Sequence, residues 1–545
     1  MATRTSPVLA FGSLLAAIST FWLAQVNATV KAPYLDEFFH VWQALAYWKN
    51  QWLVWDPKIT TPPGLYIVSY LGLFLTQWLP TESPLAQLRA HNVVSILLVF
   101  IVLNKVASAR RKGSTHLAAH TAFNVCLFPP LFFFCGLYYT DVMSILVVMM
   151  AHKAFYDKDP VQVTIYSLLS LWFRQTNIFW TAVYLGGSEV FRQIKLRQKP
   201  SGNPSYVATF SQVAKFSWSK GALYDLPVAD AFLEDYIKVV ISLVLSALRV
   251  LQSLAIPLTP YVSTLGIFTG FIIWNGGVVL GDKENHIASL HLPQMLYIWP
   301  YIAFFSWPVI LPSLCNSVLA LLPQSISELI PLNLQSGQSQ SRIRLSILLS
   351  VLLLTLAVIH YNTLIHPFTL ADNRHYTFYV FRILRRNFVT IYLLAPAYLF
   401  FAWACIGALS APGSVQKSAS SRPASSRPVT ASWLLLWLTT STLSLATAPL
   451  VEPRYFILPW IIWRMNVVTE GIGNVSHTST DSSSKRVTPI EEKLDQDTLL
   501  WWLSKMSLPL ETIWYLMINV ITGWVFLNKD FMWPNEPGEV MRFMW

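Results

Sequence analysis

The run PVLAFGSLLAAISTFWLAQV, residues 7–26, decides the fold class of this chain. A helix needs about 20 apolar residues to cross the hydrocarbon core of a bilayer, and this run has that length without a charge. Because lipid offers the backbone no hydrogen-bond partners, such a run must be helical. Further runs of this kind lie at 91–108, 121–139, 261–280, 292–312, 345–361, 388–409, 432–450 and 508–527. The sequence therefore predicts an all-α polytopic membrane protein.

The composition of the whole chain supports this prediction. Of its 545 residues, 54% are hydrophobic and 12% are charged, and the mean hydropathy is +0.47. A soluble protein has charge on about a quarter of its residues, so we expect the lipid bilayer as a partner. The net charge of +11 comes largely from basic residues in short loops, and we therefore expect no nucleic-acid partner. The four cysteines lie within or beside apolar runs, which argues against a disulfide framework or a zinc site.

Short basic loops orient the chain, because Lys and Arg mark the cytosolic side of a membrane protein. Four such loops contain no acid: 105–112, 192–199, 342–344 and 417–427. With these loops in the cytosol, residues 27–90 form one large luminal loop with juxtamembrane helices. Within it, 62–79 is a juxtamembrane or re-entrant helix in preference to a span. Residues 161–191 then fold as a tight hairpin that raises Arg174 to the luminal end.

We expect residues 1–545 to form a single transmembrane domain. Residues 200–255 are predicted to be a cytosolic loop or interfacial helix. Residues 411–431 and 474–488 are predicted to be flexible cytosolic linkers, because their Ser-, Thr- and Pro-rich composition cannot bury a core. Three arginines fall on the luminal side without an assigned role: Arg382, Arg385 and Arg386.

The acidic pair Asp36-Glu37 opens an amphipathic stretch, DEFFHVWQALAYW, directly after the first apolar run. Acids at a helix start are often only caps that the helix dipole favours, and on spacing alone this interpretation is the better one. The aromatic neighbours change the balance, because they are expected to lay the helix on the membrane surface. A carboxylate that is partly desolvated there has a raised pKa and is a better general base.

Other polar loops on the predicted luminal side contain candidate substrate-binding residues: Lys58, Arg174, Lys283, His286, Asp372, Arg374, His375 and Arg454. Each loop is also compatible with a simple solvated connection. Arg174 differs from the others because it lies within an apolar hairpin, where a charge is costly and usually functional. Arginine and lysine are suited to binding phosphate groups, so these loops favour a phosphate-containing substrate.

Seven stretches together resemble the family of dolichyl-phosphate-glucose α-1,2-glucosyltransferases. They are PYLDEFFH (33–40), WDPKITTPPGLY (55–66), FRQTN (173–177), GDKENH (281–286), LADNRHY (370–376), EPRYF (452–456) and EVMRFMW (539–545). The resemblance runs nearly from end to end and fails in 200–255 and in the two Ser-rich linkers. It implies a multi-spanning GT-C-type glycosyltransferase of the endoplasmic reticulum membrane with a luminal active site. The implied donor is dolichyl-phosphate glucose, and the implied acceptor is a dolichol-PP-linked oligosaccharide.

The resemblance also implies roles for particular residues. The first luminal loop of the family carries a catalytic acid, which corresponds here to Asp36, with Glu37 as the weaker candidate. The implied reaction inverts a β-linked donor to an α-1,2 linkage, and it needs one base and no covalent intermediate. Cations that face the leaving phosphate lower the barrier, and the candidates are Lys283, His286, Arg374, His375 and Arg454. No metal and no cofactor are expected, because these groups stabilise the phosphate directly.

Two other classes are compatible with a polytopic chain that carries polar loops. A membrane transporter would show inverted repeats and a site at the middle of the membrane, and the sequence shows neither. A channel-regulating accessory subunit would need no reactive carboxylate. The assay that distinguishes these classes is glucose transfer from a lipid-phosphate donor.

Overall fold

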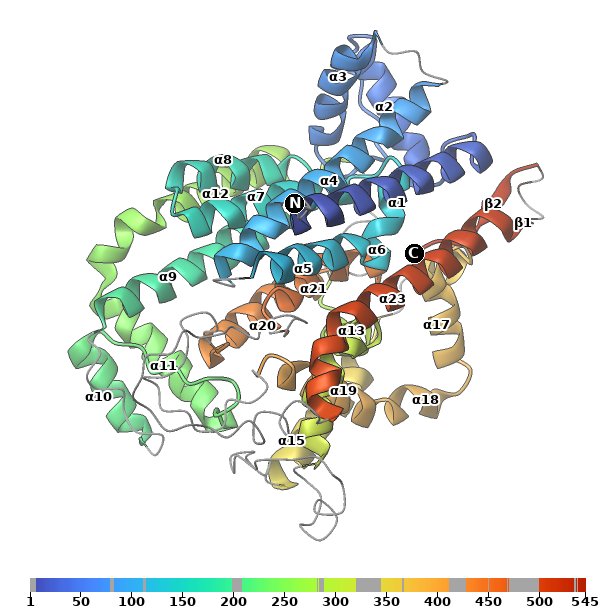
Figure 1. Cartoon of the computed structure of the whole chain (residues 1–545). Coiled ribbons are helices and arrows are strands. Elements are labelled where there is room, and N and C mark those ends of the chain that lie inside the picture. Colours follow the sequence, from blue (N-terminus) through green and yellow to red (C-terminus); the bar gives the residue numbers. More distant parts are fainter. Residues whose placement is uncertain are drawn as a thin grey trace, which may run out of the picture.

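The computed structural model describes residues 6–78, 83–110, 114–198, 208–281, 283, 289–319, 345–364, 367–410, 428–448, 450–467, 469, 499–533, 536 and 538–545. The elements of the first half are α1 (Pro7–Thr29), α2 (Asp36–Trp48), α3 (Gly64–Thr76), α4 (Pro84–Arg110), α5 (Thr115–Leu127), α6 (Pro129–Phe132), η1 (Phe133–Gly136), α7 (Asp141–Asp157), α8 (Pro160–Leu171), η2 (Phe179–Val183), α9 (Tyr184–Arg197), α10 (Phe210–Lys220), α11 (Leu233–Arg249) and α12 (Leu251–Asn275). The second half contains α13 (Gln294–Leu319), α15 (Leu345–Asn362), α16 (Pro367–Ala371), α17 (Tyr376–Leu384), α18 (Phe388–Leu393), α19 (Ala395–Gly407), α20 (Ala431–Leu445), η3 (Pro453–Phe456), α21 (Ile457–Arg464), α23 (Leu499–Asn528), β1 (Asp530–Met532) and β2 (Val540–Arg542). The predicted all-α membrane class is confirmed (Figure 1).

Within the described residues, six helices are long and apolar enough to cross a bilayer. They are Pro7–Thr29, Pro84–Arg110, Leu251–Asn275, Gln294–Cys315, Val389–Gly407 and Trp502–Asn528. A seventh candidate joins α5 to α6 and η1 and is bent by 64°. The predicted spans 345–361 and 432–450 correspond to α15 and α20. Both are shorter than the about 20 residues that a crossing helix needs, and α20 has 15 residues.

Two spanning helices begin earlier than the apolar runs indicate. Helix α4 begins at Pro84, because the buried Arg89 is paired with Glu37 and its charge does not end the helix. Residues 84–90, predicted to belong to the luminal loop, therefore lie in α4. Helix α12 begins at Leu251 and contains Pro257 and Pro260. Helices in membranes tolerate such prolines because neighbouring groups satisfy the freed backbone.

A break at Phe128 divides the seventh candidate span. Pro129 and Pro130 follow directly and start α6, and proline has no N–H with which to continue α5. The ring of Phe128 stacks on Trp460 with 3.6 Å between centroids, so the break is packed inside the core. The chain therefore turns within the bundle, toward the loop that leads into α7.

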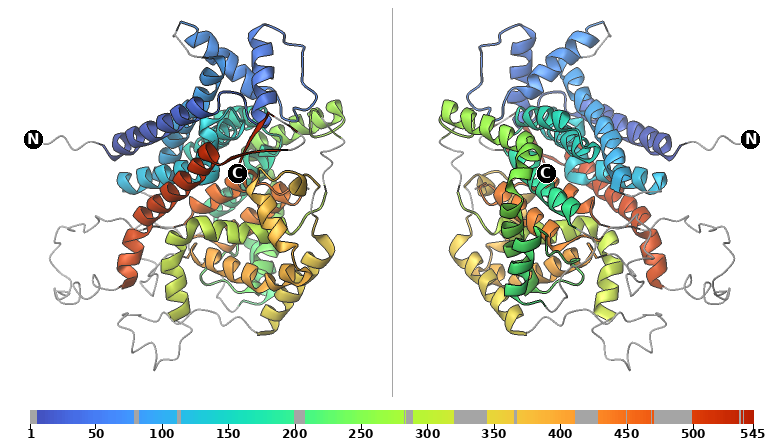
Figure 2. Two further views of the ribbon diagram at one scale, coloured as in Figure 1. Left: turned by 90° about the vertical axis from the view of Figure 1, so that its right-hand side faces the viewer. Right: turned by 90° about the vertical axis from the view of Figure 1, so that its left-hand side faces the viewer.

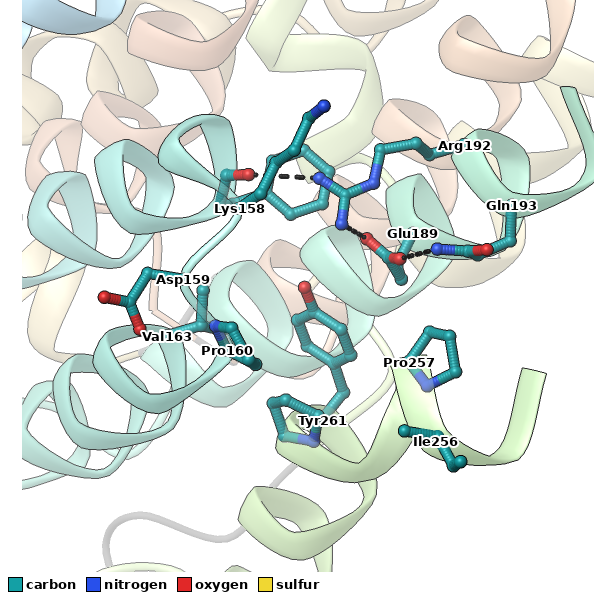
Figure 3. Close-up of a pocket in the computed structure, with 12 residues that line it drawn as sticks. Lys158, Asp159, Pro160, Val163, Glu189, Arg192, Gln193, Ile256, Pro257 and Tyr261 are labelled. Atoms are coloured by element: carbon teal, nitrogen blue, oxygen red, sulfur yellow. Dashed lines mark hydrogen bonds and ion pairs between the residues drawn. The ribbon is translucent and has the colours of Figure 1, made fainter. Parts of the chain in front are cut away.

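The predicted hairpin at 161–191 is present as α8, a turn, and η2 with α9. Asp159 caps α8 by accepting from Gln162 N at 2.9 Å, and Pro160 occupies the first turn. The outer ends of both arms meet, because residues of 158–163 and 189–193 line one pocket beside α12 (Figure 3). The turn between the arms carries Arg174 to the opposite end of the hairpin.

Two helical pairs lie apart in the molecule. Helices α2 and α3 stand at the top of Figure 1, whereas α10 and α11 lie at the lower left. The further views keep α2 and α3 at the top (Figure 2).

Strands β1 and β2 pair antiparallel, with Phe531 opposite Met541. Segment 27–90 thus contains two short helices before α4, and segment 200–255 contains α10, α11 and the start of α12.

Candidate functional site

Asp36 is the first residue of α2, and the backbone before it is strained. Leu35 has φ 54° and ψ −127°, a conformation that a residue with a β-carbon rarely adopts. Such a residue costs about 1–3 kcal/mol and is kept where the surrounding structure requires it. The turn at Leu35 therefore directs Asp36 and Glu37 to different surroundings.

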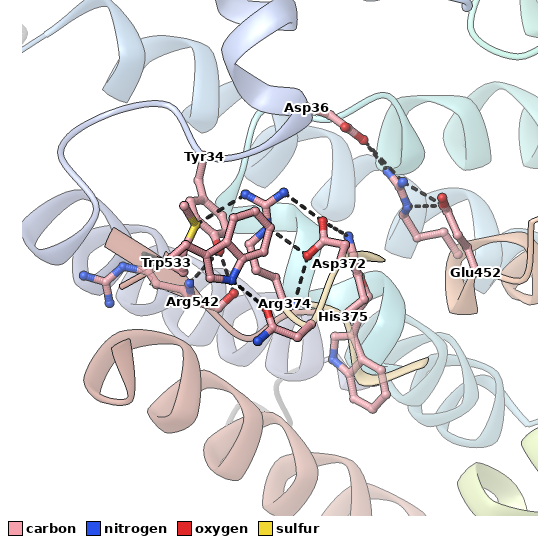
Figure 4. Close-up of polar contacts among 12 residues, drawn as sticks. Tyr34, Asp36, Asp372, Arg374, His375, Glu452, Trp533 and Arg542 are labelled. Carbon is pink, nitrogen blue, oxygen red and sulfur yellow. Dashed lines mark hydrogen bonds and ion pairs between the residues drawn. The ribbon is translucent and has the colours of Figure 1, made fainter. Parts of the chain in front are cut away.

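The Asp36 carboxylate contacts Arg454 of η3, and Figure 4 shows Asp36 on the same side of the site as Glu452. Both terminal nitrogens of Arg454 donate to Asp36 Oδ2 at 3.3 Å. The same guanidinium binds Glu452 Oε2 at 2.7 Å and lies 3.8 Å from Asp141 Oδ2. The Asp36 side chain is 52% exposed, and that of Arg454 is 11% exposed. One arginine therefore gathers three carboxylates, of which Asp36 is the most accessible.

The surroundings of Asp36 keep it ionised. Burial among many protein atoms raises its pKa, but the charge of Arg454 opposes this effect and the net pKa lies below the usual value. The raised pKa expected from the sequence is therefore wrong for Asp36, because that expectation left out the paired arginine. Burial also lowers the pKa of His40, one helical turn along α2, to about 4. His40 Nδ1 lies 2.7 Å from the hydroxyl of Tyr66. At neutral pH the site thus presents a carboxylate beside a neutral imidazole.

This arrangement predicts how the activity depends on pH. Asp36 has a lowered pKa and is in its basic form at any pH above that pKa. The acidic limb of the kcat/KM profile is therefore expected at low pH. In Arg454→Met the opposing charge is gone, burial raises the pKa, and the limb moves to higher pH. We expect the shift in kcat/KM profiles between about pH 4 and pH 8, whereas Arg454→Lys retains the charge and shifts less. An acidic limb of Arg454→Met that coincides with that of the wild type would contradict the pairing.

Glu37 is fully buried, and both of its oxygens are occupied. Arg89 donates to Oε1 at 2.8 Å and to Oε2 at 2.6 Å. The backbone N–H groups of Tyr34 and Tyr138 complete the set, at 3.0 and 2.8 Å. Arg89 also donates to Val30 O at 2.7 Å, so the pair ties the end of α1 to α4. This geometry gives Glu37 a structural role and leaves Asp36 as the accessible member of the acidic pair.

Arg174 joins the same cluster from the hairpin turn. Its Nη2 lies 2.9 Å from Asp141 Oδ1, and its guanidinium lies 5.9 Å from the ring centroid of Tyr455. The Nε of Arg174 is buried without a hydrogen-bond partner. Asp141 thus bridges two arginines, Arg174 and Arg454, and links the hairpin to the loop before α21.

Asp372, Arg374 and His375 form a second group beside the first (Figure 4). Arg374 binds Asp372 through two nitrogens, at 2.8 and 2.9 Å, and His375 Nε2 lies 3.8 Å from Asp372 Oδ2. Burial raises the pKa of Asp372, but its bonds to Arg374 outweigh this effect and the net pKa is lowered. The charge of Arg374 is therefore largely balanced by Asp372.

The segment after β1 holds this loop in place. Met544 N donates to Arg374 O at 2.9 Å, and His375 Nδ1 lies 3.2 Å from Trp545 O. The guanidinium of Arg374 also lies 4.4 Å from the ring centroid of Trp533. From the other side, the Tyr34 hydroxyl donates to Arg542 O at 2.6 Å. The stretch EVMRFMW therefore connects the 372–375 loop to the residues just before Asp36.

Three more of the quoted stretches meet at Thr60. Its carbonyl accepts from Gln175 Nε2 at 2.8 Å and from Leu280 N at 3.2 Å. Gly281 has no room for a β-carbon, which would lie 2.3 Å from Ile59 O. A glycine is therefore required where the 280s loop crosses the 57–60 loop.

Lys58 and Lys283 extend from these two crossing loops. Lys58 lies over the ring of Phe39 at 5.1 Å, and Lys283 Nζ donates to Asn275 O. Neither lysine forms an ion pair with an acid in the described part of the chain. His286 lies outside the described residues. Ion pairs through Asp141 therefore connect Arg174 to Arg454 and Asp36, and the two lysines are not part of this network in the described residues.

Three residues of the cluster are not among the sequence-based candidates: Asp141, Glu452 and His40. Asp141 is a lone charge between apolar residues, a pattern that often marks a functional position. Glu452 is two residues from Arg454, and His40 follows Asp36 by four residues, one helical turn. Glu452 thus had the same sequence signal as Arg454, a charge in a short loop, whereas the signals at Asp141 and His40 were weaker.

The described part of the chain is a bundle of membrane-length helices that holds the Asp36 carboxylate beside Arg454. The model of the DIE2/ALG10 family matches residues 30–465, and this chain belongs to that family. A relative from Emericella nidulans is 39% identical over 98% of this chain and 97% of its own length. The human relative is 28% identical over 97% and 96%. Both are named Dol-P-Glc:Glc(2)Man(9)GlcNAc(2)-PP-Dol alpha-1,2-glucosyltransferase, and no solved structure matches the chain.

Proposed function

We propose that this chain transfers glucose from Dol-P-Glc to Glc(2)Man(9)GlcNAc(2)-PP-Dol and forms an α-1,2 linkage. It is a Dol-P-Glc-dependent glucosyltransferase, as its named relatives are. The acceptor carries two glucose residues by its name, so the transferred glucose is the third. The observation that supports the site is the exposed Asp36 carboxylate held by Arg454. The transporter and accessory-subunit alternatives are not favoured, because the relatives are named as transferases.

In the proposed mechanism Asp36 acts as the general base. It takes the proton of the acceptor hydroxyl while that oxygen forms a bond to C1 of glucose. The bond between C1 and the donor phosphate oxygen breaks in the same displacement, and the electron pair leaves with the phosphate. A single displacement at a β-linked donor gives an α product. A positioned base contributes about 10²–10⁴-fold to the rate.

The leaving dolichyl phosphate gains negative charge, and we assign its stabilisation to the cations around Asp36. Arg454 and Arg174 lie in the same ion-pair network as Asp36, and His375 lies at the border of the second group. Guanidinium groups bind phosphate oxygens through two parallel hydrogen bonds. In the resting state these arginines are neutralised by carboxylates, so the donor phosphate has to compete with Asp141 and Glu452.

We place the site on the luminal side of the endoplasmic reticulum membrane. The last turns of α4 and α9 contain Arg110, Lys195 and Arg197, and basic residues at the ends of spans favour the cytosolic side. Asp36 follows α1, and Arg174 occupies the far end of the hairpin. A cysteine introduced at Lys58 is expected to react with an impermeant reagent from the lumen of sealed vesicles. Labelling from the cytosolic side would contradict this orientation.

The proposed activity is tested with the purified chain, a short-chain Dol-P-Glc and the diglucosylated lipid-linked acceptor. The expected product is one hexose heavier, and its new linkage is α-1,2 by glycosidase digestion and NMR. Dol-P-mannose in place of Dol-P-Glc is the matched donor control, and it should give no product. Absence of transfer from Dol-P-Glc by folded protein would contradict the proposal.

A further inference from the structure

Helix α11 exposes its apolar residues and buries its polar ones. Five residues spaced by three or four positions are each 47% to 54% exposed: Leu233, Ile237, Val240, Val244 and Leu248. This spacing puts them on one face of the helix, which we call the α11 stripe. The opposite face contains buried polar residues: Asp235, Lys238, Ser242 and Ser246. In a water-facing helix the two faces would be exchanged.

The buried polar face is fully engaged with α10 and with the turn that follows it. Ser242 Oγ lies 2.7 Å from Ser217 Oγ and also accepts from Tyr224 N at 2.7 Å. Ser246 donates to Ala222 O at 2.7 Å. Lys238 and the Tyr224 hydroxyl both donate to Asp235, at 3.1 and 2.9 Å. These contacts fix the rotation of α11, so the outward position of the stripe is determined by satisfied hydrogen bonds.

The stripe continues the lipid-facing surface of a spanning helix. Helix α12 starts two residues after α11 ends, and Leu251 and Ile256 at its start are 58% and 86% exposed. Its far end leads to Leu280, which donates to Thr60 O in the loop after α2. The α10–α11 pair and the Asp36 site therefore lie at opposite ends of α12.

We propose that α10 and α11 form a membrane-surface anchor in the leaflet opposite the Asp36 site, with the α11 stripe facing the acyl chains. Apolar surface of this extent is stable next to lipid and unfavourable in water. Trp218 of α10 is 54% exposed, and tryptophan favours the head-group region. The exposed cations Lys215, Lys220 and Arg249 outnumber the exposed acid Glu234, which suits a lipid surface that carries anionic head groups.

Hydrogen bonds connect the α10–α11 pair to α20, the helix that precedes Arg454 in the chain. Leu226 O accepts from Ala431 N at 2.8 Å, and Asp225 Oδ1 accepts from Ser432 N at 2.9 Å. These bonds hold the first turn of α20, and the chain beyond the other end of α20 leads to Arg454. The α10–α11 pair thus fixes the depth of α20 in the bilayer and serves a positioning role for the loop that contacts Asp36.

Depth-dependent quenching of a fluorophore tests this proposal on the full chain in phosphatidylcholine vesicles. Single cysteines at Ile237→Cys and Val244→Cys report on the stripe, and Arg249→Cys is the matched control on the same helix. Of the native cysteines, Cys126, Cys135 and Cys405 are buried and Cys315 is partly exposed, so the labelled wild type supplies the background. We expect doxyl-labelled lipid to cause the larger loss of fluorescence at 237 and 244, and aqueous iodide to cause it at 249.

Two results would overturn the proposal. Quenching of the stripe probes by iodide would place the stripe in water. Protection of these probes from both quenchers would mean that protein covers the stripe, such as a second copy of the chain. Neither readout depends on glucose transfer, so the anchor and the proposed enzymatic activity are tested separately.

Discussion

Glu37→Gln is expected to lower the free energy of unfolding by about 3–5 kcal/mol, because it leaves the buried Arg89 without its charge partner. The substitution keeps the size of the side chain, so the loss arises from charge and not from a cavity. Glutamine also places an NH2 group where the carboxylate accepts from the backbone N–H of Tyr34 or Tyr138. Thermal unfolding of the detergent-solubilised protein, followed by loss of the monodisperse fraction, measures the effect.

Glu234→Gln is the matched control for this prediction. Glu234 is exposed on α11, and its contact with Lys238 is 3.9 Å long. An exposed ion pair contributes about 0–1 kcal/mol, so this variant should unfold close to the wild-type temperature. The molecules of Glu37→Gln that remain folded should still transfer glucose. A Glu37→Gln protein with wild-type thermal stability but no transfer would assign the chemistry to Glu37 instead of Asp36.

Asp36→Asn is expected to reduce glucose transfer by about 10²–10⁴-fold, which is the contribution of a positioned general base. The amide has the size of the carboxylate but does not accept the proton of the acceptor hydroxyl. Folding should be preserved, since Asp36 is 52% exposed and Arg454 retains Glu452 as a partner at 2.7 Å. Single-turnover transfer from Dol-P-Glc, normalised to folded protein, measures the effect.

The control for Asp36→Asn is Asp230→Asn, in the turn before α11 and remote from the site. This variant should transfer glucose at the wild-type rate. If Asp36→Asn folds normally and transfers at the same rate as Asp230→Asn, Asp36 is not the base. The opposite phenotypes of Asp36→Asn and Glu37→Gln separate two residues that are neighbours in the sequence.

The fold class could be predicted from the sequence because it depends on composition over long runs. The predicted runs 7–26 and 388–409 agree closely with the observed helices Pro7–Thr29 and Val389–Gly407. The predicted helix limits are wrong where a long-range contact neutralises a residue that would otherwise end a helix. A charge such as Arg89 normally marks the end of an apolar helix. Here Glu37, 52 positions away in the sequence, neutralises it, and the helix continues. Pro257 and Pro260 signal a break unless the helix is surrounded by lipid and protein.

The sequence indicated some members of the ion-pair cluster but not how they pair. Charges in short loops that were predicted to be luminal gave Arg374 and Arg454 as candidates, and a charge within an apolar hairpin gave Arg174. Their partners could not be deduced, since the Asp36–Arg454 contact joins residues 418 positions apart. The division of roles within the acidic pair also depends on tertiary structure. Neither acid occupies the cap position, which is Leu35, but both lie in the first turn of α2, where the helix dipole favours a negative charge.

The central claim is that Asp36 accepts the proton of the acceptor hydroxyl, and chemical rescue tests it most directly. Asp36→Ala removes the carboxylate and leaves space beside Arg454 for a small anion. The rate of glucose transfer from Dol-P-Glc by this variant is measured with increasing formate at constant ionic strength. We predict slow transfer without formate and a rate that rises with formate, whereas the wild type does not respond. Transfer by Asp36→Ala at the wild-type rate in the absence of formate would contradict the account.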